Sequence, residues 1–206
     1  MGGMAAPVSP SGTSSGTSSG TIARTRRAIL DAAVTVLGRD RSAPMSEIAR
    51  AAEVGRSTLH RYFPDRAALV SGLYVQCAET IERTVGDLQL DQGEVPDAFR
   101  RLVAALFEHG QLVDFLFSEP QHNGYGWDDE RWERAHIPMA LLFVRGQDEG
   151  YFAAEFDADW FIRALWYMLS AGWEASAEGL PRHLALDRVV RTLTDGVVAH
   201  PERPTS

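Results

Sequence analysis

The segment 45–63 constrains the fold more than any other part of the sequence, because its apolar residues form two short helical patterns separated by a tight turn. Ile48 and Ala52 fall on one face of the first pattern, and Leu59 and Phe63 fall on one face of the second. These faces can pack against each other and against a preceding helix, and the proline that follows ends the second pattern. The sequence therefore predicts a helix-turn-helix within a three-helix unit.

The other side of the second pattern carries hydrogen-bond donors, in a chain whose formal net charge is −8. Arginine, serine, threonine and histidine side chains donate to phosphate oxygens and base edges, and a helix fits the major groove of duplex DNA. We therefore predict that residues 56–62 form a recognition helix. The alternative is that these arginines only solvate the surface of a three-helix segment.

Charge is distributed unevenly along the chain. Residues 1–20 carry none, and residues 21–65 hold eight arginines against five acidic residues, a net of +3. Residues 66–206 hold twelve arginines against twenty-three acidic residues, a net of −11. A small positive segment on an acidic body favours a polyanionic partner at one end of the molecule.

The stretch SEIARAAEVGRSTLHRYFPDRAALV, from Ser46 to Val70, resembles the N-terminal signature of the TetR/AcrR family of bacterial transcriptional repressors. The matching elements are the Ile-Ala pair of the first helix, the Thr-Leu and Tyr-Phe pairs of the second, and the cationic Arg66 that begins the next helix. The resemblance covers residues 22–70. It implies a repressor that binds a pseudo-palindromic double-stranded DNA operator as a dimer.

Several positions depart from that signature, among them Arg66 in place of lysine and Pro44 in place of a common threonine. Glu53 stands where the family usually has glycine, Gly55 where it has serine, and His60 where it has a tyrosine that contacts phosphate. Glu53 must therefore adopt a helix-end conformation that glycine accommodates more readily. The candidate DNA-contacting residues are Arg24, Ser46, Arg56, Ser57, Thr58, His60, Arg61, Tyr62 and Arg66.

The rest of the chain has helical patterns, with no convincing strand pair and no internal repeat. The predicted fold class is all-α. We expect a disordered tail rich in Ser, Gly and Thr over 1–20, a three-helix helix-turn-helix domain over 21–65, and a helical ligand-binding and dimerisation domain over 66–206.

Three residues are predicted helix N-caps: Thr21, Asp65 and Asp157. They open the first helix and two long helices further along the chain. About nine helices are expected in all. Their approximate ranges are 22–38, 45–52, 56–63, 66–88, 96–110, 111–119, 128–149, 158–177 and 183–199.

The family resemblance also implies that the C-terminal domain forms a homodimer. The segment DWFIRALWYMLSAGWEASA is apolar on several faces, and the last helix is apolar on one face. We expect these two helices to pair with their symmetry mates in a four-helix interface. Alternatively, they line a monomeric core. The expected dimer residues are Leu165, Gly172, Val189, Leu193 and Val197.

All five tryptophans follow residue 126, and several phenylalanines accompany them. Such rings either pack a core or line an apolar cavity between helices. With a carboxylate nearby, aromatic faces favour a flat, lipophilic, cationic ligand. The resemblance implies a small-molecule effector whose binding moves the fourth helix and releases DNA. The candidate ligand-binding residues are Phe99, Leu102, Phe107, Asp114, Phe117, Trp127, Trp132, Phe143, Trp166 and Tyr167.

Other functions find little support in the sequence. The single cysteine, Cys77, excludes an intrachain disulfide and fits a reducing cytoplasm. No apolar run approaches the roughly 20 residues of a membrane span, so we expect no membrane partner. The six histidines lack metal-ligand spacing, so we expect no metal, cofactor or enzyme activity. A helical adaptor or ligand-binding protein without DNA binding is the main alternative, and an enzyme is the least favoured.

Overall fold

The computed structural model describes residues 15–110, 112–113 and 130–197, and the regular structure within these ranges is α-helical. The expected all-α class is confirmed. The predicted sixth helix, over 111–119, falls almost entirely outside the described residues. No helix in the described ranges is long and apolar enough to cross a bilayer. The described helices are α1 (Ser15–Arg39), α2 (Met45–Ala51), α3 (Arg56–Tyr62), α4 (Arg66–Asp87), α5 (Val95–Phe107), α7 (Glu130–Asp148), α8 (Ala158–Ala177) and α9 (Arg182–Val197).

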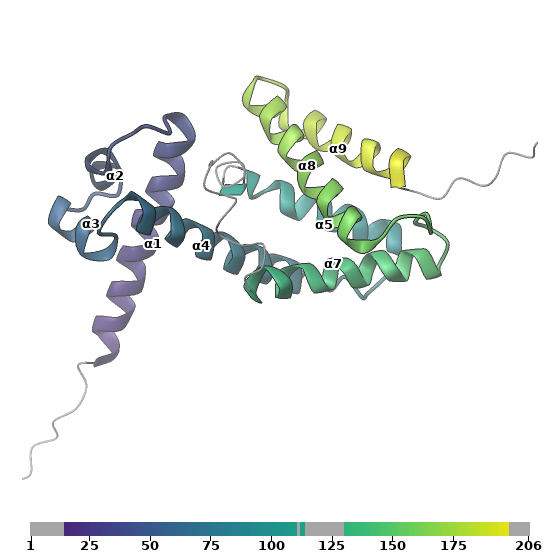
Figure 1. Ribbon diagram of the computed structural model, residues 1–206, viewed down its shortest axis with the longest axis horizontal. Coiled ribbons are helices and arrows are strands. Elements are labelled where there is room, and N and C mark those ends of the chain that lie inside the picture. Colours follow the sequence, from purple (N-terminus) through teal and green to yellow (C-terminus); the bar gives the residue numbers. More distant parts are fainter. Residues whose placement is uncertain (1–14, 111, 114–129, 198–206) are drawn as a thin grey trace, which may run out of the picture.

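The helices form two packed units that share α4 (Figure 1). α1, α2 and α3 surround the N-terminal part of α4, and the remainder of α4 lies beside α7. α5, α8 and α9 complete the second unit, in which α8 packs on both α7 and α9. One continuous cluster of buried apolar residues runs through both units. α4 is therefore the element through which the two units contact each other most directly.

Two of the three predicted N-caps are confirmed. The carboxylate of Asp65 accepts a hydrogen bond from the backbone N–H of Ala68 at 2.8 Å, and that of Asp157 accepts one from Trp160 at 2.6 Å. Each bond satisfies one of the N–H groups that a helix leaves unpaired at its start. These caps define where α4 and α8 begin.

The third predicted cap, Thr21, is wrong, because α1 begins at Ser15 and continues through it. The carbonyl oxygen of Thr21 accepts a bond from the hydroxyl of Thr25, one turn further on. Residues 15–20, placed in the expected disordered tail, thus belong to α1. Serine, threonine and glycine disfavour a helix by at most about 1 kcal/mol each, and extending an existing helix avoids the cost of nucleation.

The turn between α2 and α3 has the geometry expected from its sequence. Glu53 has a φ of 55°, in the left-handed region. Its N–H donates to the carbonyl of Arg50 at 3.1 Å, and the N–H of Val54 donates to that of Ala49 at 2.9 Å. This pair of bonds forms a Schellman motif, which usually has glycine at the left-handed position. The chain then reaches Gly55, the N-cap of α3.

Four phenylalanines organise the core of the second unit. Phe99 of α5, Phe143 of α7 and Phe161 of α8 meet around Phe152, which follows α7. The rings of Phe143 and Phe161 stack with centroids 4.5 Å apart. Gly146 makes room for this packing, since a Cβ there would lie 2.2 Å from Cδ2 of Phe152. The rings fill the space where α5, α7 and α8 converge.

Polar contacts reinforce the packing between α4 and α7. Nε of Arg134 donates to Oε1 of Glu82 at 2.7 Å. Arg145 donates to the carbonyl oxygens of Leu90 at 3.1 Å and Asp91 at 2.8 Å, just beyond the end of α4. These bonds tie the C-terminal half of α4 and the residues after it to α7.

Four residues expected at a dimer interface are instead buried inside the single chain. Leu165, Val189 and Leu193 are 0%, 4% and 3% exposed. A Cβ on Gly172 would lie 2.5 Å from Val189. In the single chain, α8 and α9 use them to pack on each other and on the core, and a dimer contact through them stays a prediction. An apolar helix face does not reveal whether the helix that covers it belongs to the same chain. Val197 ends α9, and its side chain lies outside the described set.

The left-handed residue of the turn gives a stability prediction. Glu53→Gly should raise the free energy of unfolding by about 0.5–1 kcal/mol, because relief of the left-handed strain exceeds the added freedom of the unfolded chain. Ala51→Gly, in a right-handed helical position two residues earlier, is the control and should lower it by about 1 kcal/mol. Denaturant titration followed by circular dichroism measures both. A loss of stability in the first variant would contradict the strain at Glu53.

Candidate functional site

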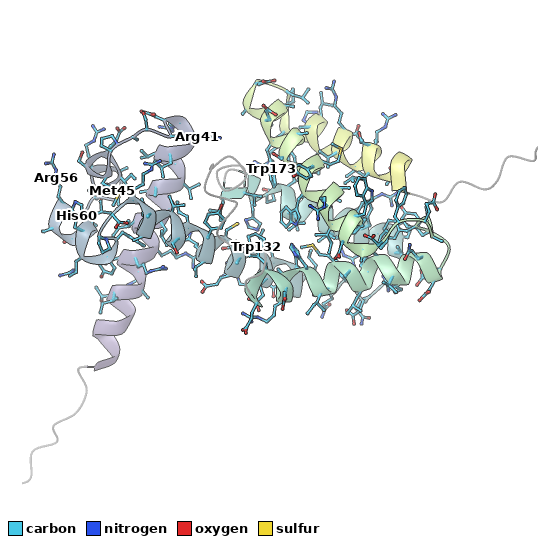
Figure 2. The ribbon with its side chains drawn as sticks, viewed as in Figure 1. Arg41, Met45, Arg56, His60, Trp132 and Trp173 are labelled. Carbon is cyan, nitrogen blue, oxygen red and sulfur yellow. The ribbon has the colours of Figure 1, made fainter. Side chains whose placement is uncertain are left out.

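The outward side of α3 lies at the end of the molecule farthest from the second unit, where Figure 2 labels Arg56 and His60. On the opposite side of α3, Leu59 and Phe63 are 1% and 2% exposed. The structure therefore holds a row of donors outward by burying the other side of the helix. The predicted contacts on α3 comprise the exposed Arg56, Ser57, His60 and Arg61 and the half-buried Thr58 and Tyr62.

Two contacts orient side chains on this outward side. Nδ1 of His60 lies 3.1 Å from the carbonyl oxygen of Pro64, a hydrogen bond that requires the proton on Nδ1. The guanidinium carbon of Arg61 lies 5.5 Å from the ring centroid of Tyr62. Side chains that are already oriented lose less freedom when they bind a partner.

The predicted DNA contacts outside α3 lie in three different environments. Arg24 is exposed on α1, and Ser46 is half-buried in the first turn of α2. Arg66 donates to the carbonyl oxygens of Ala43, at 3.2 Å, and Arg41, both in the loop between α1 and α2. Arg66 thus ties the start of α4 to that loop, a structural task that the sequence pattern did not reveal.

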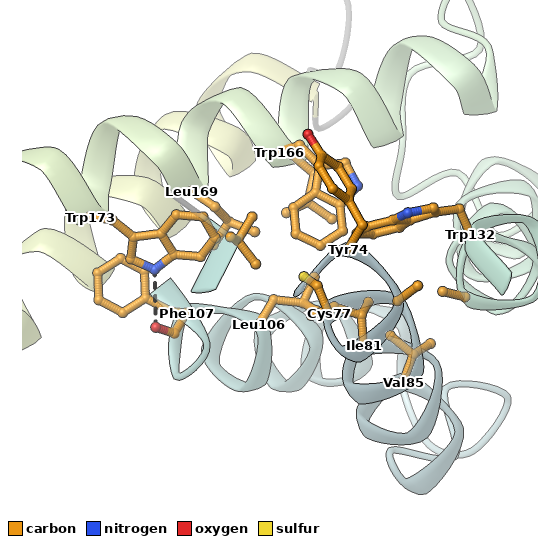
Figure 3. Packing of buried hydrophobic residues seen from close by; sticks show 14 of the residues in the cluster. Tyr74, Cys77, Ile81, Val85, Leu106, Phe107, Trp132, Trp166, Leu169 and Trp173 are labelled. Carbon is orange, nitrogen blue, oxygen red and sulfur yellow. Dashed lines mark hydrogen bonds between the residues drawn. The ribbon is translucent and has the colours of Figure 1, made fainter. Parts of the chain in front are cut away.

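A second candidate region lies around Trp132 of α7 and Trp166 of α8. Their ring centroids are 6.0 Å apart and their planes are nearly perpendicular, at 87°. The indole N–H of Trp166 donates to Nε2 of His136 at 3.1 Å. α4 contributes Tyr74 and Cys77 to the same buried cluster (Figure 3). We call Trp132, His136 and Trp166 the tryptophan cluster.

The imidazole of His136 is neutral at pH 7. Burial lowers the pKa of His136 to about 4, and the negative charge of Asp159 only partly offsets this effect. The bond from Trp166 also requires an unprotonated Nε2. Sequence reasoning missed His136, although its position four residues after Trp132 places both on one side of α7.

The fold separates the remaining predicted ligand-binding residues. Phe99 and Phe143 belong to the four-phenylalanine core, and Leu102 is fully buried on α5. Tyr167 is 60% exposed on α8. Of the predicted residues that the structure describes, only Trp132 and Trp166 meet directly in the tryptophan cluster. Three predicted residues, Asp114, Phe117 and Trp127, lie outside the described part of the chain.

Phe107 is the last residue of α5, and side chains of α8 and α9 contact it from two sides. Its carbonyl oxygen accepts hydrogen bonds from Nε1 of Trp173 at 3.0 Å, drawn in Figure 3, and from Arg182 at 2.9 Å. The guanidinium of Arg182 also lies 5.4 Å from the ring centroid of Phe107. Gly110 makes room for the indole, since a Cβ there would lie 2.3 Å from it. These contacts give Phe107 a structural role at the end of the helix.

Comparison with known proteins decides the class of this molecule. The model of the bacterial regulatory proteins of the tetR family matches residues 29–73, from α1 through the helix-turn-helix into α4. The transcriptional repressor LfrR of Mycolicibacterium smegmatis is 33% identical over 178 residues, which cover 86% of this chain and 93% of LfrR. The chain belongs to the TetR family. It is therefore a transcriptional regulator, with a regulatory and not a catalytic role.

Further similarity extends beyond the helix-turn-helix of this TetR-family chain. The transcriptional regulator NfxB of Pseudomonas aeruginosa is 29% identical over 161 residues, 73% of this chain and 83% of NfxB. The crystal structure of LfrR in complex with proflavine matches with a TM-score of 0.68 and 34% identity, over 86% of this chain and 99% of that one. The family resemblance noted in the sequence is thus confirmed, and it includes the C-terminal helices.

Proposed function

We propose that this TetR-family regulator is a repressor that binds a pseudo-palindromic operator as a homodimer and releases it when a lipophilic cation binds the second unit. The observation that carries the proposal is the exposed row of donors on α3, including Arg56 and Arg61, backed by the buried Leu59 and Phe63. Because the operator is bacterial DNA, the repressor acts in the cytoplasm.

The outward side of α8 and α9 supports a dimer through a face different from the one expected. Ala164, Met168, Ala171 and Ala175 follow one another at helical spacing on α8 and are exposed or half-buried in the single chain. Leu186 and Val190 on α9 are also half-buried, at the same spacing. Small residues allow a second helix to approach closely, which suits an isologous four-helix contact. Such a dimer would present two recognition helices roughly 34 Å apart, one turn of DNA.

The tryptophan cluster supports a cationic aromatic effector. The faces of Trp132 and Trp166 attract positive charge, and the neutral His136 adds none that would repel it. LfrR, similar over most of the chain, has been crystallised with proflavine, a planar aromatic dye that carries positive charge. We infer that this chain responds to ligands of the same chemical class.

α4 supplies the connection between effector and DNA. In the first unit, Nε2 of Gln76 on α4 donates to Oδ1 of Asp31 on α1 at 2.7 Å. In the second unit, Glu82 of α4 pairs with Arg134 of α7, and Trp132 lies on α7 as well. A ligand can release DNA only if it binds more tightly to the released arrangement of α4 than to the DNA-bound one.

Removing one exposed arginine tests DNA binding. Arg61→Ala should weaken binding to the DNA upstream of the gene about tenfold and reduce the slope of log affinity against log salt by about 1, with an unchanged melting temperature. Arg100→Ala, an exposed arginine on α5, is the control and should change neither. Gel shifts at two salt concentrations measure both. If the unaltered protein ignores this DNA at low salt, the chain is a helical adaptor or ligand-binding protein and the proposal fails.

A charge on the outward side of α8 tests the dimer. Ala171→Glu should halve the mass in solution, because an unpaired carboxylate would be buried in an apolar contact. Ile137→Glu places the same charge on an exposed apolar residue of α7 and should leave the dimer intact. Analytical ultracentrifugation separates the cases. If only Ile137→Glu dissociated the dimer, the interface would lie on α7 and not on α8.

Dye binding tests the effector class. Proflavine should quench the tryptophan fluorescence and release the upstream DNA, and Trp132→Ala should weaken dye binding about tenfold, since it removes an aromatic face. Trp132→Phe retains a ring and should bind more tightly than the alanine variant, with both kept below their melting temperatures. The planar anion 9-anthracenecarboxylate should have no effect. A response to the anion without one to proflavine would overturn the ligand class.

A further inference from the structure

The ring of Phe63 packs against α4 at Gly72, where that helix has no side chain. Phe63 follows the recognition helix directly and is its C-terminal cap. A Cβ on Gly72 would lie 2.7 Å from Cε1 of Phe63, well inside the ~3.5–4.0 Å of ordinary carbon–carbon contact. Alanine would favour the helix at this position more than glycine does. What the glycine permits is the close approach of the ring to the backbone of α4.

Arg26 and Leu30 of α1 pack at the same contact. The guanidinium carbon of Arg26 lies 5.4 Å from the ring centroid of Phe63. Leu30 is fully buried, and its Cδ2 lies 3.3 Å from the Cβ position of Gly72, as does Nη2 of Arg26. Three helices thus meet at one point, where α1 crosses α4 (Figure 1). We call Arg26, Leu30, Phe63 and Gly72 the joint.

We propose that the joint transmits movement of α4 to the recognition helix, and that Gly72 is a positioning residue for DNA binding; this inference rests on the proposed function. α3 has seven residues, and Phe63 is covalently next to the last of them. Because closely packed contacts transmit displacement and do not absorb it, a rotation of α4 carries the ring and the end of α3 with it. Gly72 itself does not contact DNA in this arrangement.

The position of the joint along α4 fits this role. Gly72 lies between Arg66, which holds the start of α4 to the α1–α2 loop, and Glu82, which pairs with Arg134 of α7. A movement that begins beside α7 therefore passes the joint before it reaches the end of the helix. The small size of residue 72 sets how closely α3 approaches α4, and hence the separation of the two recognition helices in the dimer.

Two glycines of the same helix provide matched variants. Gly72→Ala introduces the contact with the ring, whereas Gly86→Ala places the same methyl group where no atom beyond the neighbouring backbone of α4 lies within 4 Å. A third variant, Phe63→Leu with Gly72→Ala, removes Cε1 and with it the closest atom. All three are made in the full-length chain, and their folding is checked by circular dichroism and melting temperature.

The readout is preference for operator spacing, which a loss of packing alone would not change. The probes are the upstream DNA fragment and two derivatives of it. One derivative has one base pair inserted at the centre of the segment that the bound protein protects in footprinting, and the other has one base pair removed there. Gly72→Ala should bind the unaltered fragment at least tenfold more weakly than Gly86→Ala. Gly72→Ala should also bind one of the derivatives more tightly than the unaltered fragment, because the separation of its two recognition helices has changed. The double variant should recover affinity for the unaltered fragment relative to Gly72→Ala.

The outcomes separate the joint from the proposed function. If the unaltered protein fails to bind any fragment, the repressor function falls and the joint falls with it. If that protein binds and Gly72→Ala behaves like Gly86→Ala, only the joint is overturned. It is also overturned if Gly72→Ala weakens all three fragments equally, or if the double variant recovers nothing.

Discussion

Burial of Leu59 and Phe63 is the interaction on which the functional interpretation depends. α3 has only seven residues, far fewer than an isolated helix needs to be stable in water. Burying a leucine or phenylalanine side chain stabilises the folded state by about 1.5–3 kcal/mol. The burial of these two side chains therefore stabilises a helix that is too short to be stable through its own hydrogen bonds. The same burial decides which side faces outward. The donors of α3 reach a partner because the apolar side is occupied.

α4 gives this local arrangement a wider consequence. It packs on α1 of the first unit and on α7 of the second, and polar contacts accompany both. A helix held in this way is packed against both units. At Gly72 the ring of Phe63 occupies the space that a Cβ on α4 would need. The chain thereby combines the outward donors of α3 with a helix that reaches the region where an effector is proposed to bind.

The aromatic residues of the second unit divide into a core and a candidate site. Phe143 and Phe161 stack deep between helices and serve packing. Trp132 and Trp166 are buried too, but they surround a neutral histidine and lie in one cluster with residues of α4. Amino-acid type does not distinguish these two groups, since large rings favour both a core and a pocket. Neighbouring polar atoms and the position of each ring along α7 and α8 make the distinction.

The sequence by itself determined the features that depend on neighbours along the chain. The spacing of Leu59 and Phe63, the caps at Asp65 and Asp157 and the left-handed turn at Glu53 all follow from contacts within a few residues. The extent of α1 beyond Thr21 did not, because weak helix formers do not mark an end when the helix continues from a packed segment.

Only the tertiary structure decided which helix covers which face. Leu165 and Val189 lie on apolar faces that the sequence identifies, and in the structure these faces pack within one chain. The structural task of Arg66 and the place of Phe63 on Gly72 likewise join residues that are distant in sequence or belong to different helices. Burial drives an apolar face away from water without specifying its partner, and the shapes and positions of the surrounding helices make that choice.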